Sequence, residues 1–140
     1  MSGLILPDVP YKEKEEFDVV LKKYGLYLIS MIAPTSHQRI QTIAKDANGF
    51  IYCVSSLGVT GVRSTITTDI SAMVNLVREV TDVPIAVGFG ISTPEQAKKK
   101  AGQSDGAIVG SAIVKIVEKY GKDAPKYVEE YVKEMVQAIK

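Results

Sequence analysis

Five short apolar runs divide the chain, and none of them alternates strictly with polar residues. Uninterrupted apolar runs of this length are typical of strands that are covered on both faces, which is the situation in a parallel sheet. The pattern therefore predicts five buried parallel strands. The runs are LILPDV at 4–9, YLISMIA at 27–33, FIYCVSS at 50–56, IAVGFG at 85–90 and GAIVGS at 106–111.

Segments with helical spacing of apolar residues separate these runs. Gly25 and Gly49 are placed to end the first two helices, and Thr35 or Ser36 is placed to cap the second. Ser92 and Glu95 have the spacing of a capping box. The expected helices lie within 11–25, 35–49, 67–82, 92–102, 110–121 and 124–140.

The alternation of strands and helices predicts an α/β protein. Right-handed crossovers leave two common architectures, an open doubly wound sheet and a closed (β/α) barrel. A closed barrel takes eight units and about 250 residues, whereas this chain offers five units. We therefore expect a partial (β/α) TIM-type barrel of five parallel strands, with an open five-stranded doubly wound sheet as the alternative. No linker composition divides the chain, which predicts a single domain over residues 1–140.

Composition and charge narrow the classes of partner. The 140 residues are 46% hydrophobic and 24% charged, which suits one globular core. With 17 basic and 16 acidic residues the net charge is +1, so we expect neither a nucleic acid nor a membrane as partner. Cys53 lies in an apolar run and is expected to be a buried thiol. His37 is the single histidine and is expected to be a solvated first-turn residue, so we expect no metal site and no cofactor.

The beginning of the sequence favours a cytoplasmic location. It has no basic leader, and its apolar run is too short for a signal peptide or a membrane span. Apolar, strand-like sequence starts within three residues of Met1, so we expect that part of an ancestral core preceded it.

Three glycine-bearing turns follow consecutive expected strands, at 58–61 (GVTG), 88–90 (GFG) and 110–112 (GSA). Glycine allows the backbone to approach a ligand closely, and a phosphate binds where amides converge at the start of a helix. Barrel enzymes often bind phosphate with the loops after their last two strands. The turns therefore predict a phosphate site on one rim, while the alternative that they only complete strand-to-helix turns stays open.

Other candidate residues carry weaker signals. Asp8 ends the first expected strand and has either a pocket role or a turn role. Tyr52 offers a phenol within a strand, where packing is the competing explanation. The long connection from Ser55 to Asp69 is about twice the usual length for such units, and long loops at strand ends often carry function.

Several motifs together resemble the tryptophan synthase alpha chain family, in the order of that family and over essentially the whole chain. They are LPDVP, IAPTS, GFIYCVSSLGVTGVR, PIAVGFGIS, PEQ and DGAIVGSAIVKIVE. The resemblance implies a (β/α)8 barrel and a lyase of tryptophan biosynthesis. That enzyme cleaves indole-3-glycerol phosphate to indole and glyceraldehyde 3-phosphate, and passes the indole to a beta chain.

The resemblance also implies roles for individual residues. Thr60 in the GVTG loop assists catalysis beside Gly61, and Tyr52 lies near the catalytic carboxylate. Phe89 lines the indole pocket. Backbone amides of three residues hold the phosphate, namely Gly90, Gly110 and Ser111.

The chain departs from the family pattern because it matches only strands four to eight. The family takes its catalytic glutamate and an indole-binding aspartate from the amino-terminal part, and neither has a counterpart here. We therefore expect the chain to keep the phosphate-binding part and to lack full activity alone. Open sheet edges also predict self-association. Two alternatives remain, a non-catalytic phosphate-binding or scaffold domain and a small complete enzyme that uses Asp8 as its base.

Overall fold

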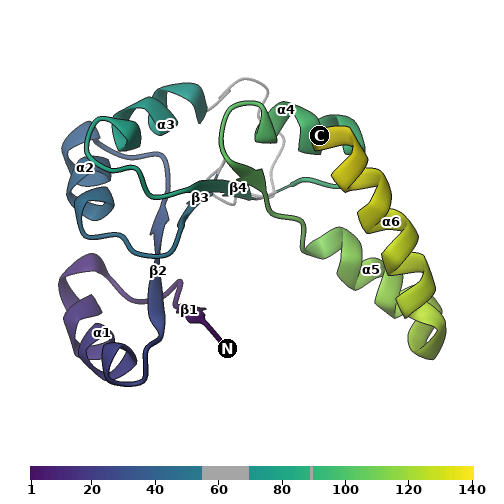
Figure 1. The fold of residues 1–140 in the computed structure, drawn as a ribbon, viewed down its shortest axis with the longest axis horizontal. Helices are drawn as coiled ribbons and strands as arrows, with labels where there is room; N and C mark the ends of the chain where they lie inside the picture. Colours follow the sequence, from purple (N-terminus) through teal and green to yellow (C-terminus); the bar gives the residue numbers. More distant parts are fainter. Residues whose placement is uncertain (55–69, 89) are drawn as a thin grey trace. The chain divides into compact units, whose positions relative to one another are not determined.

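Five parallel strands alternate with helices in the computed structural model, which describes residues 1–54, 70–88 and 90–140 (Figure 1). The strands are β1 (Gly3–Ile5), β2 (Tyr27–Ile32), β3 (Ile51–Val54), β4 (Ile85–Gly88) and β5 (Gly106–Ala107). The helices are α1 (Lys14–Lys23), α2 (His37–Lys45), α3 (Ile70–Arg78), α4 (Pro94–Ala101), α5 (Ser111–Tyr120) and α6 (Ala124–Ile139). Short 3-10 helices at Tyr11–Glu13 and Gly121–Asp123 precede α1 and α6.

The strands follow one another in the sheet in chain order, from β1 to β5. The pairs β1–β2, β2–β3 and β4–β5 are parallel, with Gly3 opposite Tyr27, Ser30 opposite Ile51 and Ala86 opposite Gly106. A doubly wound sheet reverses its strand order at one point, and the described strands have no such reversal. The α/β class with five parallel strands is confirmed, and the doubly wound alternative is wrong.

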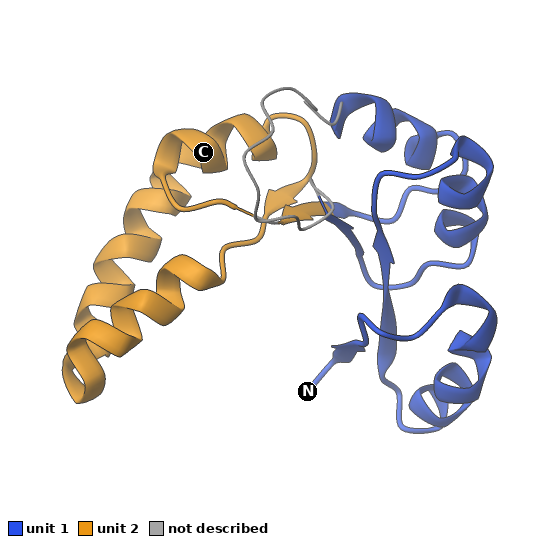
Figure 2. Cartoon of the chain, turned by 180° about the vertical axis from the view of Figure 1, so that it is seen from behind, with its two compact units in different colours: residues 1–85 blue, residues 86–140 orange. Residues whose placement is uncertain are grey.

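The chain forms two compact units, residues 1–85 and 86–140 (Figure 2). The core of the first unit is built from branched side chains of β2, α2, β3 and the start of β4. Ile32, Ile40, Ile51 and Ile85 are each at most 1% exposed. These are positions at which the apolar pattern repeats with strand or helix spacing, so the pattern identified this core.

The second unit has a smaller core beneath α4 and α6. Ile91, Ala97 and Met135 are buried together, and Ala107, Val109 and Tyr131 pack against them. Helix α6 lies along both α4 and α5 within this unit. The apolar stripe on α6 is buried only in part, because Met135 is 6% exposed whereas Val132, Val136 and Ile139 are 38–42% exposed. The prediction of a single domain over residues 1–140 stays a prediction.

Helix ends agree with the sequence at most positions. Gly25 and Gly49 adopt positive φ angles of 67° and 74°, and the Ser36 side chain accepts a hydrogen bond from the Arg39 amide as the cap of α2. The expected capping box at Ser92 and Glu95 is wrong by one residue. Thr93 caps α4, and Gln96 completes the box.

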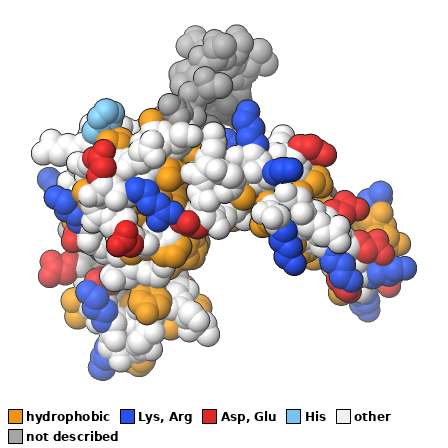
Figure 3. Space-filling view, turned by 45° about the horizontal axis from the view of Figure 1, so that its top comes forward, with side chains coloured by type: hydrophobic (Ala, Val, Ile, Leu, Met, Phe, Trp, Pro, Cys, Tyr) orange, Lys and Arg blue, Asp and Glu red, His pale blue; other side chains and the backbone are white. Residues whose placement is uncertain are grey.

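The surface carries both signs of charge. On the face seen in Figure 3, Lys and Arg side chains are interspersed with Asp and Glu side chains. His37 is exposed as the first residue of α2, and Cys53 is 2% exposed, as predicted for both. Within the described residues, no helix has the length and apolar character needed to cross a membrane.

Candidate functional site

Two strand-to-helix junctions lie next to each other in the second unit. Val87 of β4 is in register with Ala107 of β5, and the Ile108 amide donates a hydrogen bond to the Val87 carbonyl at 2.8 Å. Because the strands are parallel, their carboxyl ends reach the same edge. The residues that follow them, Gly90 in one junction and Gly110 in the other, therefore lie at one edge of the pair.

The first junction leads into a helix whose amino terminus is occupied by its own side chains. Thr93 Oγ1 accepts from the Gln96 amide at 3.3 Å, and Gln96 Oε1 accepts from the Thr93 amide at 3.2 Å. Gln96 Oε1 also accepts from the Ser92 amide at 2.9 Å. This network satisfies amides that a helix start otherwise leaves open. Because the Thr93 and Gln96 amides are already bonded and Pro94 has none, the start of α4 is poorly suited to bind an anion.

The second junction leads into a helix whose amino terminus has no side-chain cap. Gly110 is the N-cap of α5 and has no side chain with which to accept a hydrogen bond. The Ile113 and Val114 amides bond to the Gly110 carbonyl, whereas the Ser111 and Ala112 amides have no partner among the described residues. The first turn of α5 holds no acidic residue. Its open amides and the positive end of the helix dipole favour an anion.

Space is open above the glycines of both junctions. A Cβ atom built on Gly90 or on Gly110 would meet no described atom within 4 Å. Gly90 has a φ of 70°, which favours glycine by itself, but Gly110 is at −123°. Packing against the described residues therefore gives no reason for glycine at position 110. Both residues and Ser111 are exposed, so a ligand has access to their amides.

Tyr131 ties α6 to the first of these junctions. Its hydroxyl donates to the Ser92 carbonyl at 2.9 Å, while its ring packs against the core that includes Ile91. Burial raises the pKa of the Tyr131 phenol above its ordinary value of 10.0. The segment from Gly90 to Thr93 is thus fixed from two sides, by Tyr131 and by the capping network. Sequence reasoning missed Tyr131, because the apolar stripe of α6 accounts for an aromatic residue at this position.

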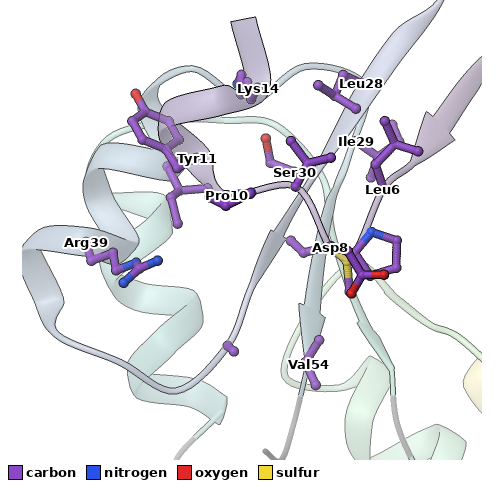
Figure 4. A pocket seen from close by; sticks show the side chains of 15 residues that line it. Leu6, Asp8, Pro10, Tyr11, Lys14, Leu28, Ile29, Ser30, Arg39 and Val54 are labelled. Carbon is purple, nitrogen blue, oxygen red and sulfur yellow. The ribbon is translucent and has the colours of Figure 1, made fainter. Parts of the chain in front are cut away.

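The remaining described candidates, Tyr52 and Asp8, lie in the first unit. Tyr52 is half-buried on β3, on the face opposite to the buried Ile51 and Cys53. Asp8 is exposed in the turn after β1 and lines a pocket of about 400 Å³ together with residues of α1, β2 and α2 (Figure 4). Tyr11, beside this pocket, donates a hydrogen bond to Asp46. This bond is the main cause of the raised pKa of Tyr11, and burial and the Asp46 charge add to it.

The structure thus brings Gly90, Gly110 and Ser111 to adjacent junctions. The other predicted site residues are not part of this group. Thr60, Gly61 and Phe89 lie outside the described residues, as does the connection from Ser55 to Asp69. Within the described ranges, no cluster of three or more His, Cys, Asp or Glu residues could hold a metal ion.

Curated relatives match nearly the whole of this chain. The relative from Lacticaseibacillus casei is 46% identical over 139 residues, which cover 99% of this chain and 52% of the relative. That from Thermoanaerobacter sp. strain X514 is 47% identical over 140 residues, 100% of this chain and 53% of the relative. Both are named tryptophan synthase alpha chain. The chain therefore spans about half the length of these relatives.

Solved structures give the same result for the fold. A tryptophan synthase alpha subunit from Campylobacter jejuni aligns with a TM-score of 0.78 at 30% identity, covering 96% of this chain and 52% of that one. A structure from Pyrococcus furiosus, described as the tryptophan synthase a2b2 complex, aligns with a TM-score of 0.79 at 25% identity, covering 98% and 53%. The described fold is thus a partial TIM-type barrel. The family model for the tryptophan synthase alpha chain matches residues 1–140, and the chain belongs to that family.

Proposed function

We propose that the chain is the carboxy-terminal part of a tryptophan synthase alpha chain that keeps the phosphate-binding part of the site for indole-3-glycerol phosphate. The observation that carries the proposal is the uncapped start of α5 beside the Gly90 junction. The amides of Gly90, Gly110 and Ser111 donate to the phosphate oxygens. These donors are neutral, and the helix dipole adds attraction for the dianion.

Cleavage of the substrate requires catalytic groups in addition to a phosphate-binding site. Breaking the bond between indole and the glycerol phosphate requires that the indole ring gains a proton and that a hydroxyl of the substrate's glycerol chain loses one. By the resemblance, Thr60 and Gly61 close over the substrate, Phe89 lines the indole pocket, and Tyr52 lies near a catalytic carboxylate. That carboxylate has no counterpart in this chain. A placed acid or base contributes roughly 10²- to 10⁴-fold, so the chain alone lacks full activity.

Partners follow from the same reasoning. The strands β1 and β5 end the strand order, so each presents an edge without a neighbouring strand among those described. Such edges favour pairing with a second chain. Self-association, or association with an amino-terminal half, therefore completes the sheet. The a2b2 complex of the Pyrococcus furiosus relative suggests a beta chain as a further partner.

The test is indole release from indole-3-glycerol phosphate, measured for the chain alone and with an added amino-terminal half of the Lacticaseibacillus casei relative. Rescue by the added half, with little turnover by the chain alone, supports the proposal. Full turnover by the chain alone contradicts it and favours a small complete enzyme. If neither the chain alone nor the chain with the added half releases indole, and the chain still binds inorganic phosphate, the second candidate is favoured, a non-catalytic phosphate-binding domain.

A further inference from the structure

The pocket of the first unit is lined by none of the residues assigned above to phosphate or indole. It is formed by the turn after β1, the start of α1, β2, the first two turns of α2 and the end of β3, all within residues 1–85. Its volume of about 400 Å³ falls within the range of roughly 300–1,000 Å³ that is common for small-molecule sites. Pro7, Leu28 and Ile43 contribute to a lining that is largely apolar.

Ser30 in the wall of this pocket is a polar residue without a partner. It occupies the middle of β2, is 7% exposed, and its Oγ has no hydrogen bond with any residue that the structure describes. A buried hydroxyl left in this state costs about 1–3 kcal/mol. Because the hydroxyl makes no bond in its present rotamer, a χ1 rotation toward the pocket would break none. A polar group in the pocket would thus supply a hydrogen bond that no described residue gives to this hydroxyl.

Arg39 supplies a charge at the same pocket. It belongs to the first turn of α2, and Figure 4 shows its guanidinium directed toward the pocket from the side opposite Asp8. Its guanidinium has no ion pair or hydrogen bond with any residue that the structure describes. Lys14 is a second cation of the lining, but its ammonium already donates to the Asp46 carbonyl at 3.2 Å. Arg39 is therefore the cation of this lining that is available to a ligand.

We propose that this pocket binds a small organic carboxylate with an apolar body. The guanidinium of Arg39 binds the carboxylate through two parallel hydrogen bonds, which is the geometry that this pair favours. The rotated Ser30 hydroxyl donates to the same group, and the apolar body packs on Leu28 and Ile43. Asp8, on the opposite side, disfavours a second negative charge, so the ligand is a monoanion.

Benzoate is a suitable probe, with benzamide as its neutral counterpart of the same shape. The experiment is a titration of the whole chain, followed by amide shifts in 1H–15N NMR spectra. We expect benzoate to shift amides around Ser30 and Arg39, and benzamide to bind about tenfold or more weakly. Arg39→Gln should weaken benzoate binding about tenfold or more. Lys122→Gln, which removes the same charge from the second unit, should leave it unchanged.

Ser30→Ala tests the hydroxyl separately from the charge and removes an unpaired polar atom, so it should fold at least as well as the parent chain. We expect it to weaken benzoate binding several-fold. Three results would overturn the inference. They are no shifts at the pocket amides, equal binding of benzamide and benzoate, or unchanged benzoate affinity in Arg39→Gln.

Discussion

The starts of α4 and α5 in the second unit treat the amides of their first turns in opposite ways. At the start of α4, the side chains of Thr93 and Gln96 accept the hydrogen bonds of the first amides. At the start of α5, Gly110 offers no side chain, and the Ser111 and Ala112 amides stay open among the described residues. The two junctions follow adjacent parallel strands, so their surroundings are otherwise closely comparable.

The difference separates a structural helix start from one that is able to bind an anion. A capping box adds stability because it satisfies amides within the chain. An uncapped start gives up that stability and leaves its donors for a ligand. Among the described residues nothing packs against the position of a Gly110 side chain, so the Gly110 junction is the more informative of the two. Substitutions that exchange the character of the two starts therefore test the proposed function.

Gly110→Asp should have the largest effect. The new carboxylate caps α5, occupies its open amides and repels a phosphate, so we expect phosphate affinity to fall by about tenfold or more. Stability should stay equal or rise by a few tenths of a kcal/mol, because Asp is a slightly better cap than Gly. Phosphate titration and urea unfolding measure the two effects.

Two companion variants sharpen this result. Gly110→Asn caps the helix without adding a charge, so it separates the occupation of the amides from repulsion. Lys122→Gln changes the net charge by the same amount at a distant exposed site. If Gly110→Asp binds phosphate as well as the parent chain does, the start of α5 is not the phosphate site.

Thr93→Ala should affect stability and not phosphate binding. Loss of the cap of α4 should lower the free energy of unfolding by about 1 kcal/mol. The phosphate affinity should change less than twofold, because the proposed phosphate donors are at Gly90 and at the start of α5 and not at the cap of α4. Urea unfolding and phosphate titration of one sample give both values. A loss of affinity as large as that of Gly110→Asp would mean that the two junctions act as one site.

Tyr131→Phe removes the hydrogen bond to the Ser92 carbonyl and keeps the ring in the core. We expect a loss of about 0.5–1.5 kcal/mol in the free energy of unfolding. Phosphate affinity should fall modestly, because the segment from Gly90 to Thr93 then has one support fewer. Tyr127→Phe, on the same helix, is a suitable control. Equal effects of the two substitutions would contradict a positioning role for Tyr131.

The alkaline pH dependence is the smallest expected effect. Burial raises the pKa of Tyr131 in the folded chain above 10.0, so the folded state keeps the proton longer than the unfolded state does. The stabilisation is fully present below the unfolded pKa and is lost as the pH rises through the folded pKa. The free energy of unfolding of the parent chain, measured with urea, should therefore fall above about pH 10. That of Tyr131→Phe should fall less steeply. If the free energy of unfolding falls with pH equally steeply in both chains, Tyr131 does not contribute to this pH dependence.

The sequence predicted the elements of the fold more closely than their ends. The apolar runs located all five strands because uninterrupted burial leaves a strong signal. The strand of the first run ends already at Ile5, and within the run at 106–111 only Gly106–Ala107 form the strand. Capping was misplaced by one residue because both Ser92 and Thr93 are suitable caps. Pro94 is the first residue of α4, which makes Thr93 the cap, and the Gln96 side chain then accepts a hydrogen bond from the Thr93 amide.

The candidate site could be predicted only in part. Glycine spacing pointed to Gly90, Gly110 and Ser111, because open backbone amides are what a phosphate needs. The sequence indicated a capping box at the start of α4, although one residue early, but it did not show which amides at the start of α5 lack a partner among the described residues. Ser30 was missed for a related reason, because a serine within a buried strand usually finds a partner, and only coordinates show that this one has none.

The most direct test of the central claim is a titration of the 15N-labelled chain with inorganic phosphate, followed residue by residue. The account predicts that the amides of Gly90, Gly110 and Ser111 shift together with one dissociation constant, while those of Thr93 and Gln96 stay in place. Shifts confined to the start of α4, or scattered over lysine-rich helix surfaces with no response at Gly110 and Ser111, would contradict it.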